Sequence, residues 1–209
     1  MSVRIIAGLL KGMRLQVPQI SRPTTVRMRT SLFDTISSYF FVNDLVWRDL
    51  HVLDCFAGSG ALGMEAISRG CASCDFVEKS REAYRILQRN VRDLENVSVF
   101  YDDFMRYCDA MVSRKRYDLF FIDPPYNMYD LSRVLRAASS LACQQALYVV
   151  EVSSRAGDFD DSNACKTLAE LMCVDIVEIE LIKIIRIAGS VAVLFAQSRV
   201  DGASVARRP

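Results

Sequence analysis

The tetrapeptide Asp123-Pro124-Pro125-Tyr126 follows an apolar run with the composition of a strand and has residues suited to chemistry on an amino group. Its two prolines remove two backbone donors and fix φ near about −65°, so the Asp123 carboxylate and the Pro124 carbonyl remain as rigid acceptors. The aromatic ring that follows can stack on a planar base. We therefore predict that Asp123, Pro124 and Tyr126 are catalytic residues that hold a planar exocyclic amine.

A glycine-rich loop, Gly58-x-Gly60-x-x-Gly63, lies between a predicted strand that ends at Asp54 and the next predicted helix. A tight glycine turn at such a junction lets a ligand approach backbone N–H groups. The same spacing fits the dinucleotide fingerprint, so the glycines alone leave a nicotinamide dehydrogenase and a methyltransferase both open. The predicted cofactor contacts in this region are Asp54, Phe56, Ala57, Gly58 and Gly60.

Acidic residues end the next two predicted strands. Glu78 comes 24 residues after Asp54, where a carboxylate can accept hydrogen bonds from both hydroxyls of a ribose. Asp102 or Asp103 could accept from an adenine amino group, and we favour Asp103, which could also cap the next helix. With Asp123 these residues complete the predicted cofactor site.

The motif at Asp123 to Tyr126 decides between the enzyme classes. A dehydrogenase would use the glycine loop and Glu78 but would leave this motif without a purpose. A noncatalytic RNA-binding protein would need neither an intact cofactor loop nor an amine-binding motif. The residues therefore favour an amino-methyltransferase that uses S-adenosyl-L-methionine.

The elements that must position these residues alternate along the chain. From Leu50 onward, apolar runs alternate with amphipathic helical patterns, which predicts an α/β fold with a parallel sheet covered on both faces. Two β-rich segments near the C-terminus, separated by three residues, predict an antiparallel hairpin at the sheet edge. The expected strands are 52–56, 75–78, 97–101, 119–123, 147–152, 174–187 and 191–197, and the expected helices are 61–69, 80–94, 104–112 and 131–142.

Residues 1–49 have a different pattern. Gly8, Gly12 and Pro18 punctuate a β-like piece, and Thr24 or Thr25 could cap a helix that runs to about residue 41. We expect an N-terminal RNA-binding arm over 1–49, a methyltransferase domain over 50–199 and a flexible tail over 200–209. The predicted RNA contacts are the six basic residues of the first 33 positions, which contain no acidic residue: Arg4, Lys11, Arg14, Arg22, Arg27 and Arg29.

Composition bounds the remaining possibilities. The 209 residues are 51% hydrophobic and 24% charged with a net charge of +1, which suits one globular domain with no strong overall field. Seven cysteines, an odd number, without a signal peptide indicate reduced thiols and a cytoplasmic location. Cys71 and Cys74 lack a second ligand pair and His51 is the only histidine, so we expect no metal site. The apolar stretches are shorter than the roughly 20 residues of a membrane span, so we expect no membrane partner.

The glycine loop, strand-end acid and Asp-Pro-Pro-Tyr motif together resemble class I, Rossmann-like methyltransferases that act on amino groups. A narrower resemblance, to the RsmD family of bacterial ribosomal RNA methyltransferases, covers roughly residues 4–197. It rests on Arg4-Ile-Ile-Ala-Gly8, Arg22-Pro-Thr-Thr25 and Asp54-Cys-Phe-Ala-Gly-Ser-Gly-Ala-Leu-Gly63, followed by Glu78 and the motif at Asp123.

This resemblance implies a mostly parallel seven-stranded sheet and methylation of the exocyclic N2 of guanine 966 in 16S ribosomal RNA by S-adenosyl-L-methionine. It also implies an assembling 30S particle as substrate and a monomeric enzyme. Val26 and Thr30 depart from the family, whose arm has acidic residues there, so arm packing and RNA contact stay open. An amino-methyltransferase acting on adenine in DNA or on a protein glutamine remains the alternative, because the same acceptors fit any planar NH2 group.

Overall fold

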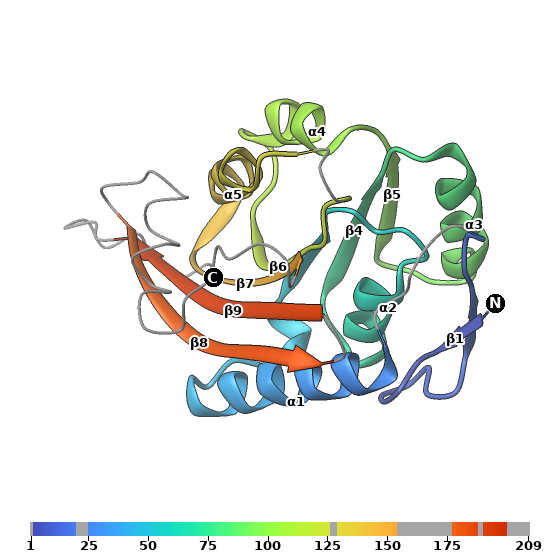
Figure 1. The fold of residues 1–209 in the computed structure, drawn as a ribbon, viewed down its shortest axis with the longest axis horizontal. Coiled ribbons are helices and arrows are strands. Elements are labelled where there is room, and N and C mark those ends of the chain that lie inside the picture. The colour runs from blue at the N-terminus through green and yellow to red at the C-terminus, as the bar shows by residue number, and fades with distance from the viewer. Residues whose placement is uncertain (1, 20–24, 126–128, 154–176, 188–189, 200–209) are drawn as a thin grey trace.

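A seven-stranded sheet with helices on both faces forms the centre of the molecule (Figure 1). The computed structural model describes residues 2–19, 25–125, 129–153, 177–187 and 190–199. The strands of the sheet are β3 (His51–Asp54), β4 (Ser73–Glu78), β5 (Val97–Tyr101), β6 (Tyr117–Ile122), β7 (Ala142–Ser153), β8 (Val177–Ile187) and β9 (Ser190–Arg199). The helices are α1 (Val26–Val42), α2 (Ala61–Ser68), α3 (Arg81–Val91), α4 (Phe104–Met111), α5 (Leu131–Ser140) and the 3-10 turn η1 (Trp47–Asp49).

The order of the strands reverses direction between β3 and β6. The order is β5-β4-β3-β6-β7-β9-β8, and β3 pairs in parallel with both β4 and β6. Because the chain moves outward in both directions from β3 and β6, the loops at their carboxyl ends diverge there, where α/β folds bind ligands. β9 is antiparallel to both β7 and β8, so the predicted mostly parallel sheet with a C-terminal hairpin is confirmed.

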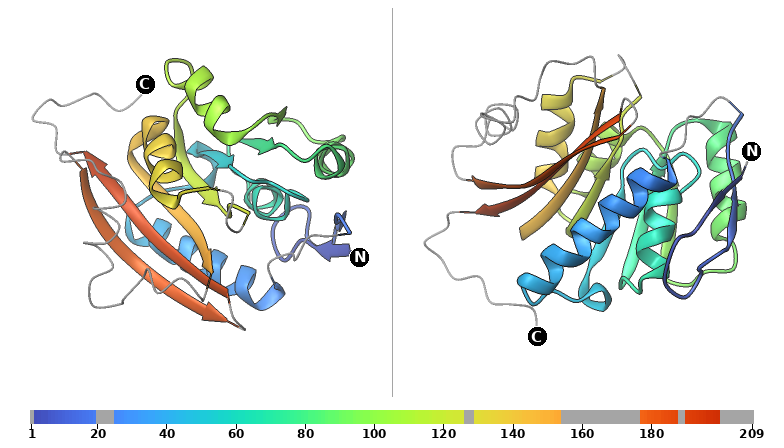
Figure 2. Two further views of the ribbon diagram at one scale, coloured as in Figure 1. Left: turned by 45° about the horizontal axis from the view of Figure 1, so that its top comes forward. Right: turned by 60° about the horizontal axis from the view of Figure 1, so that its bottom comes forward.

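Alternate residues of the strands face two separate cores, which explains the near-continuous apolar runs of the sequence. Val52 and Leu119 pack with α1, α2 and α3 on one face. Leu53 and Phe120 pack with α4 and α5 on the other. Figure 2 shows these two helical layers from two further directions. The sheet is therefore buried on both sides, and its carboxyl edge is free to carry polar residues.

Polar side chains cap the helices, at Thr25 and Asp103 as the sequence predicted and also at Ser80. The hydroxyl of Thr25 accepts a hydrogen bond from the N–H of Met28 at 3.2 Å and starts α1, while Thr24 lies outside the described residues. Asp103 caps α4 and Ser80 caps α3 in the same way. Element boundaries agree with expectation to within a few residues, except that β7 begins at Ala142, five residues earlier than predicted.

The N-terminal segment shares its core with the main sheet. A small antiparallel hairpin of β1 (Ser2–Arg4) and β2 (Arg14–Gln16) precedes α1, whose apolar face packs in the same cluster as the residues of α2 and β3. The buried Glu65 of α2 accepts hydrogen bonds from the N–H groups of Ile6 at 2.8 Å and Ala7 at 3.0 Å. Residues 2–19 and 25–49 therefore pack as part of one body with the sheet.

No helix in the described part of the chain is long and apolar enough to cross a lipid bilayer. The tail that we expected at 200–209 lies outside the described residues.

Candidate active site

The loop after β3 is held by a buried carboxylate. Asp54 is 4% exposed, and its Oδ2 accepts a hydrogen bond from the N–H of Gly63 in the first turn of α2 at 3.0 Å. Burial raises the pKa of Asp54 to about 7, against the opposing effect of the Gly63 hydrogen bond and with a further contribution from Glu78. Asp54 was predicted to contact the cofactor. In the structure its clearest contact fixes the loop to the helix.

The three glycines of the loop have different physical roles. A Cβ on Gly60 would lie 2.5 Å from Cδ1 of Leu87, and a Cβ on Gly63 would lie 2.3 Å from the ring of Phe76, so both positions are needed for packing. Gly58 has φ of +55°, and a Cβ there would meet nothing within 4 Å. Gly58 is therefore the glycine that leaves open space for a ligand beside the backbone.

Glu78 lies beside this loop at the end of β4. Its Oε2 accepts the N–H of Gly58 at 2.8 Å, and its Oε1 accepts the N–H of Ser80 at 2.6 Å. A carboxylate has about four acceptor positions, so each oxygen retains capacity for a hydroxyl group. The structure thus brings the predicted ribose acceptor and the glycine turn into direct contact.

Asp103, the predicted adenine acceptor, lies at the end of the next strand and has three partners. Its Oδ1 accepts the N–H of Met105 at 3.0 Å, which confirms its predicted role as a helix cap. Its Oδ2 accepts from the hydroxyl of Tyr129 and, at 3.4 Å, from Nζ of Lys79. The neighbouring Asp102 instead pairs with Arg106 at 2.7 Å. Neither contact set tests which of the two carboxylates accepts from an adenine, so Asp103 stays a prediction.

Lys79 and Tyr129 are site residues that the sequence analysis missed. The only sequence signal was position: Lys79 follows Glu78 directly, and Tyr129 lies three residues beyond Tyr126. The ring of Tyr129 lies 5.2 Å from that of Phe56, centroid to centroid, and Phe56 lies 5.1 Å from Phe104. The predicted loop residue Phe56 is therefore part of an aromatic wall beside Asp103, and Ala57 next to it is buried.

Asp123 directly follows the strand β6 at the same edge of the sheet. Burial raises its pKa to about 8, and the nearby carboxylates of Glu151 and Asp54 contribute in the same direction. Pro124 is partly exposed, and Tyr126 lies outside the described residues. Since neighbouring carboxylates help to raise the pKa of Asp123, a cation is favoured beside it, because a positive charge would relieve the repulsion.

The donor set fits S-adenosyl-L-methionine, which carries a positively charged sulfonium and an ammonium group beside an adenosine. The open space at Gly58 and the free lone pairs of Glu78 suit a ribose, and Phe56 with Asp103 suits an adenine. The carboxyl groups at the ends of β3 and β6 suit the positive charges. Within the described ranges there is no group of three or more His, Cys, Asp or Glu residues able to hold a metal ion.

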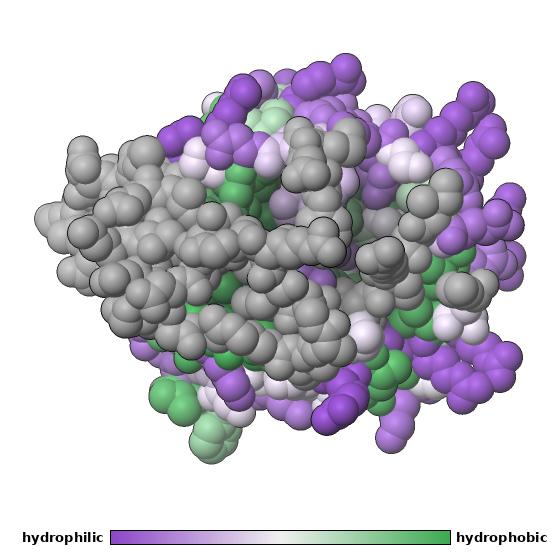
Figure 3. Space-filling model, viewed as in Figure 1, coloured by the Kyte–Doolittle hydropathy of each residue, from purple (hydrophilic) through white to green (hydrophobic). Residues whose placement is uncertain are grey.

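Four of the predicted RNA-contacting residues are exposed. Arg4 and Arg14 are direct cross-strand partners in the β1–β2 hairpin, whose other face buries Val3 and Leu15. Like charges directly opposite one another are destabilising in the absence of an anion. Figure 3 shows mostly hydrophilic residues at the edge of the molecule where β1 and α3 lie. The other two exposed residues are Lys11 and Arg27, and Arg22 lies outside the described residues.

The predicted RNA contact of Arg29 is wrong, because its side chain is fully buried. Its Nη2 donates to the carbonyl of Arg4 at 3.1 Å. Burial lowers the pKa of its guanidinium, and the carboxylate of Glu65 partly offsets this effect. Arg29 follows the helical spacing of the apolar residues Phe33, Ile36 and Phe40, and this periodicity was the signal for its burial.

Asn90 connects the hairpin to the cofactor loop. Its side-chain oxygen accepts the N–H of Gln16 at 3.0 Å. Its side-chain nitrogen donates to the carbonyls of Gln16 and Ser59, both at 2.9 Å. Since Ser59 lies between Gly58 and Gly60, the basic hairpin is held in a fixed relation to the predicted cofactor site.

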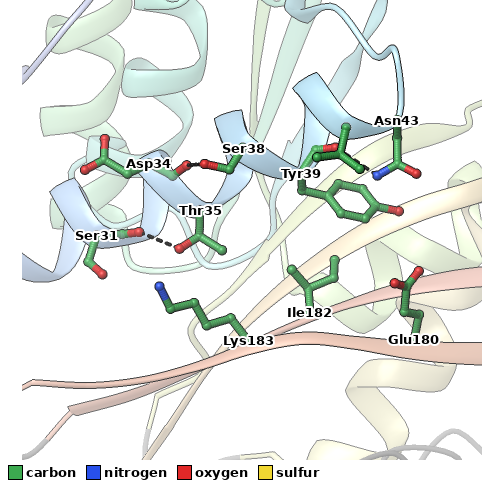
Figure 4. A pocket seen from close by; sticks show the side chains of 10 residues that line it. Ser31, Asp34, Thr35, Ser38, Tyr39, Asn43, Glu180, Ile182 and Lys183 are labelled. Atoms are coloured by element: carbon green, nitrogen blue, oxygen red, sulfur yellow. Dashed lines mark hydrogen bonds between the residues drawn. The ribbon is translucent and has the colours of Figure 1, made fainter.

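A groove of about 570 Å³ lies away from these residues, between α1 and β8 (Figure 4). Figure 4 shows Tyr39 and Thr35 of α1 facing Ile182 and Lys183 of β8. β8 is the outermost strand and is separated from β6 by β7 and β9. The groove therefore belongs to the sheet edge and not to the strand ends that carry Glu78 and Asp123.

A protein-family model and a methyltransferase of known name both match this chain. The family model described as conserved hypothetical protein 95 matches residues 3–171. The ribosomal RNA small subunit methyltransferase D of Buchnera aphidicola is 36% identical over 129 residues, which are 60% of this chain and 63% of that protein.

Solved structures show the same fold. The putative methyltransferase yhhF of Escherichia coli has a TM-score of 0.71 and 25% identity over 95% of this chain and 99% of its own. The Thermus thermophilus 16S rRNA N2 G1207 methyltransferase, solved with S-adenosylmethionine and guanosine, has a TM-score of 0.64 and 18% identity over 95% of this chain and 50% of its own.

Proposed function

The chain belongs to the family described as conserved hypothetical protein 95, the RsmD family that its motifs resemble, and from this premise we propose that it methylates the exocyclic N2 of a guanine in small-subunit ribosomal RNA. The methyl donor is S-adenosyl-L-methionine. The observation that carries the proposal is the arrangement of Asp123 and Pro124 beside the Gly58 loop and Glu78, at the switch point of one sheet.

The chain's residues hold the cofactor through its adenosine part. Glu78 accepts hydrogen bonds from the ribose hydroxyls, Asp103 accepts one from the adenine amino group, and Phe56 contacts the adenine ring. The cofactor supplies a methyl group on a positively charged sulfur, which keeps the bonding electron pair when the methyl leaves. The carboxyl groups of Asp54 and Asp123 favour this positive charge, since both pKa values are raised in its absence.

Asp123 and Pro124 orient the target amine. Guanine N2 is a poor nucleophile because its lone pair is delocalised into the ring, and hydrogen bonds from its two hydrogens to the Asp123 carboxylate and the Pro124 carbonyl localise that pair. Positive charge develops on the nitrogen as the new N–C bond forms, and the carboxylate stabilises it more than it stabilises the neutral amine. The same carboxylate, hydrogen-bonded to the amine, is the group that would accept the proton the amine loses once the N–C bond has formed.

The remaining parts of the proposal concern the RNA. Tyr126 stacks on the target base after it leaves its own stack. The exposed basic residues of the hairpin and the start of α1 bind phosphates. The finer proposals are guanine 966 as the target, an assembling 30S particle as the substrate, a monomeric enzyme and a cytoplasmic location. Family membership does not favour the alternative of a DNA adenine or protein glutamine substrate.

The test compares two substitutions at opposite ends of the strand β6. Asp123→Ala removes the amine acceptor at the carboxyl end, and Asp118→Ala is the matched control near the opposite end, where its carboxylate accepts the N–H of His51 at 2.8 Å. Small-subunit particles from a strain that lacks the enzyme are incubated with radiolabelled cofactor, and the modified nucleotide is mapped.

At saturating cofactor we expect Asp123→Ala to lower single-turnover methyl transfer by roughly 100-fold or more, a much larger effect than the loss of cofactor affinity that calorimetry should show. Asp118→Ala should retain activity. Near-normal transfer by folded Asp123→Ala would refute the amine-acceptor role, and methylation of a nucleotide other than a guanine N2 would refute the proposed substrate.

A further inference from the structure

The solvent side of α3 carries a row of arginines that the proposed function does not use. Arg81, Arg85 and Arg89 follow one another at intervals of four residues, which places them on one side of the helix. All three are exposed, whereas Leu87 and Val91 on the opposite side are buried in the core. This arginine row is about 12 Å long, since a helix rises about 1.5 Å per residue.

The arginine row lowers the stability of the free protein. Cations one turn apart on a helix repel each other, which applies to Arg81 with Arg85 and to Arg85 with Arg89. Arg81 also lies in the first turn, where the helix dipole disfavours a positive charge. Among the described residues none of the three forms an ion pair, and Glu82 is the only acidic residue of the helix. Such a row is suited to an anionic partner that would relieve the repulsion.

The basic β1–β2 hairpin adjoins the same helix. The side chain of Asn90, next to Arg89, accepts the N–H of Gln16 at 3.0 Å and donates to its carbonyl at 2.9 Å. Gln16 ends β2 on the same face of the hairpin as Arg14. Figures 1 and 2 show the hairpin alongside α3. The positive charges of the two elements therefore lie on neighbouring surfaces at one edge of the molecule, which Figure 3 shows as mostly hydrophilic.

The first turn of α3 begins at the candidate active site. Ser80 caps the helix, and its N–H donates to Oε1 of Glu78 at 2.6 Å. The other oxygen of Glu78 accepts the N–H of Gly58 at 2.8 Å. Arg81 thus lies three residues after the predicted ribose acceptor. The arginine row begins at the edge of the sheet to which the proposed function brings the RNA.

Aromatic side chains lie beside the arginine row. Tyr84, about one turn after Arg81, is partly exposed, and the centre of its ring lies 5.1 Å from that of Tyr101. Tyr101 ends β5 and is 54% exposed. Exposed aromatic rings next to arginines suit RNA, whose unpaired bases stack on such rings, better than they suit an acidic protein surface.

We propose that the arginine row of α3 is a second RNA-binding surface, which holds phosphates of the ribosomal RNA substrate in addition to those bound by the hairpin. The inference rests on the proposed function for the identity of the RNA. A guanidinium group binds phosphate oxygens through parallel N–H donors. Each phosphate that is neutralised releases counterions, so binding through the row depends on salt.

Binding across a salt series tests the row. The ligands are small-subunit particles from a strain that lacks the enzyme and protein-free 16S ribosomal RNA from the same strain. The test variant combines Arg85→Gln with Arg89→Gln and leaves Arg81, next to the cofactor loop, unchanged. The matched control combines Arg48→Gln with Arg114→Gln, which removes the same two charges from exposed positions before β3 and β6, at the opposite edge of the sheet from the candidate site.

The α3 variant should bind both ligands roughly 10-fold more weakly than wild type at about 0.1 M salt, and its slope of log affinity against log salt should be flatter by roughly 1.5. The control variant should match wild type in both quantities. Because the substitutions relieve repulsion on α3, the melting temperature should stay level or rise. Cofactor affinity, measured by calorimetry, should not change. Weaker RNA binding that comes with a lower melting temperature and weaker cofactor binding would mean a structural role and would overturn the inference.

The remaining outcomes separate the inference from its alternatives and from the proposed function. An unchanged affinity and slope would show that the row is only a solvated face. Weaker binding to particles with unchanged binding to protein-free RNA would show that the row contacts a ribosomal protein, which also overturns the inference. Methylation of the same particles by wild type is measured in parallel. If wild type binds them without methylating them, the proposed function fails, and the comparison of slopes still decides whether α3 binds RNA.

Discussion

The raised pKa of Asp123 makes the stability of the free protein depend on pH in a predictable direction. The carboxyl pKa is about 8 in the folded chain against an ordinary value of 3.8, because of burial and of the neighbouring Glu151 and Asp54. Between these two values the folded chain keeps a proton that the unfolded chain has lost. The resulting contribution to stability is fully present below pH 3.8 and is lost as pH rises toward 8.

The substitution Asp123→Asn removes this titration while preserving the shape of the side chain. One proton gives a slope of at most about 1.4 kcal/mol per pH unit, so the contribution falls by up to about 2.7 kcal/mol between about pH 5 and pH 7. The Asp123 side chain is partly exposed to water, which screens the effect, and we expect about 1.5 kcal/mol. Relative to wild type, Asp123→Asn should therefore gain about 1.5 kcal/mol of unfolding free energy over this interval.

Urea unfolding followed by circular dichroism, without cofactor, measures the difference between the two proteins at each pH. Asp109→Asn, at an exposed position of α4, controls for the change in net charge. Titration of Asp54 contributes to both proteins and largely cancels in the difference. A difference that stays flat, or that shrinks as pH rises, would show that Asp123 is not held in its protonated form.

Three further predictions follow from the same geometry. Cofactor binding should tighten between about pH 6 and pH 8 and release protons, since a cation beside Asp123 favours its ionised form, and calorimetry in buffers of different ionisation enthalpy measures this release. Gly60→Ala should destabilise the protein by about 1 to 2 kcal/mol more than Gly12→Ala in denaturant titrations. Both glycines have positive φ, but of the two only Gly60 has a neighbour, Leu87, with which the added Cβ would collide. The exposed basic residues of the N-terminal segment are Arg4, Lys11, Arg14 and Arg27. Neutralising all four should flatten the slope of log affinity against log salt for small-subunit particles by roughly 3 and leave cofactor affinity unchanged. An unaltered slope would show that RNA is held elsewhere.

The sequence by itself determined the parts of the candidate site that depend only on residues adjacent in the chain. The proposed amine acceptors at Asp123 and Pro124 follow from two prolines that remove donors, and the open turn at Gly58 follows from glycine's freedom at positive φ. The alternation of apolar runs and helical patterns also gave the order of strands and helices, because each element must bury an apolar face. The strand-end position of Glu78 then followed, since parallel strands bring their carboxyl ends to one edge.

Contacts between distant residues were decided only by the tertiary structure. Arg29 counted as a surface charge by composition, but the packing of α1 against the sheet buries it. Tyr129 comes to Asp103 across 26 positions of sequence, and Asn90 holds Ser59 across 31. The pKa of Asp123 likewise depends on Glu151 of the neighbouring strand β7 and on burial. The physical reason is that local pattern fixes which face of an element is apolar, whereas partners and electrostatic environment arise only when the elements pack together.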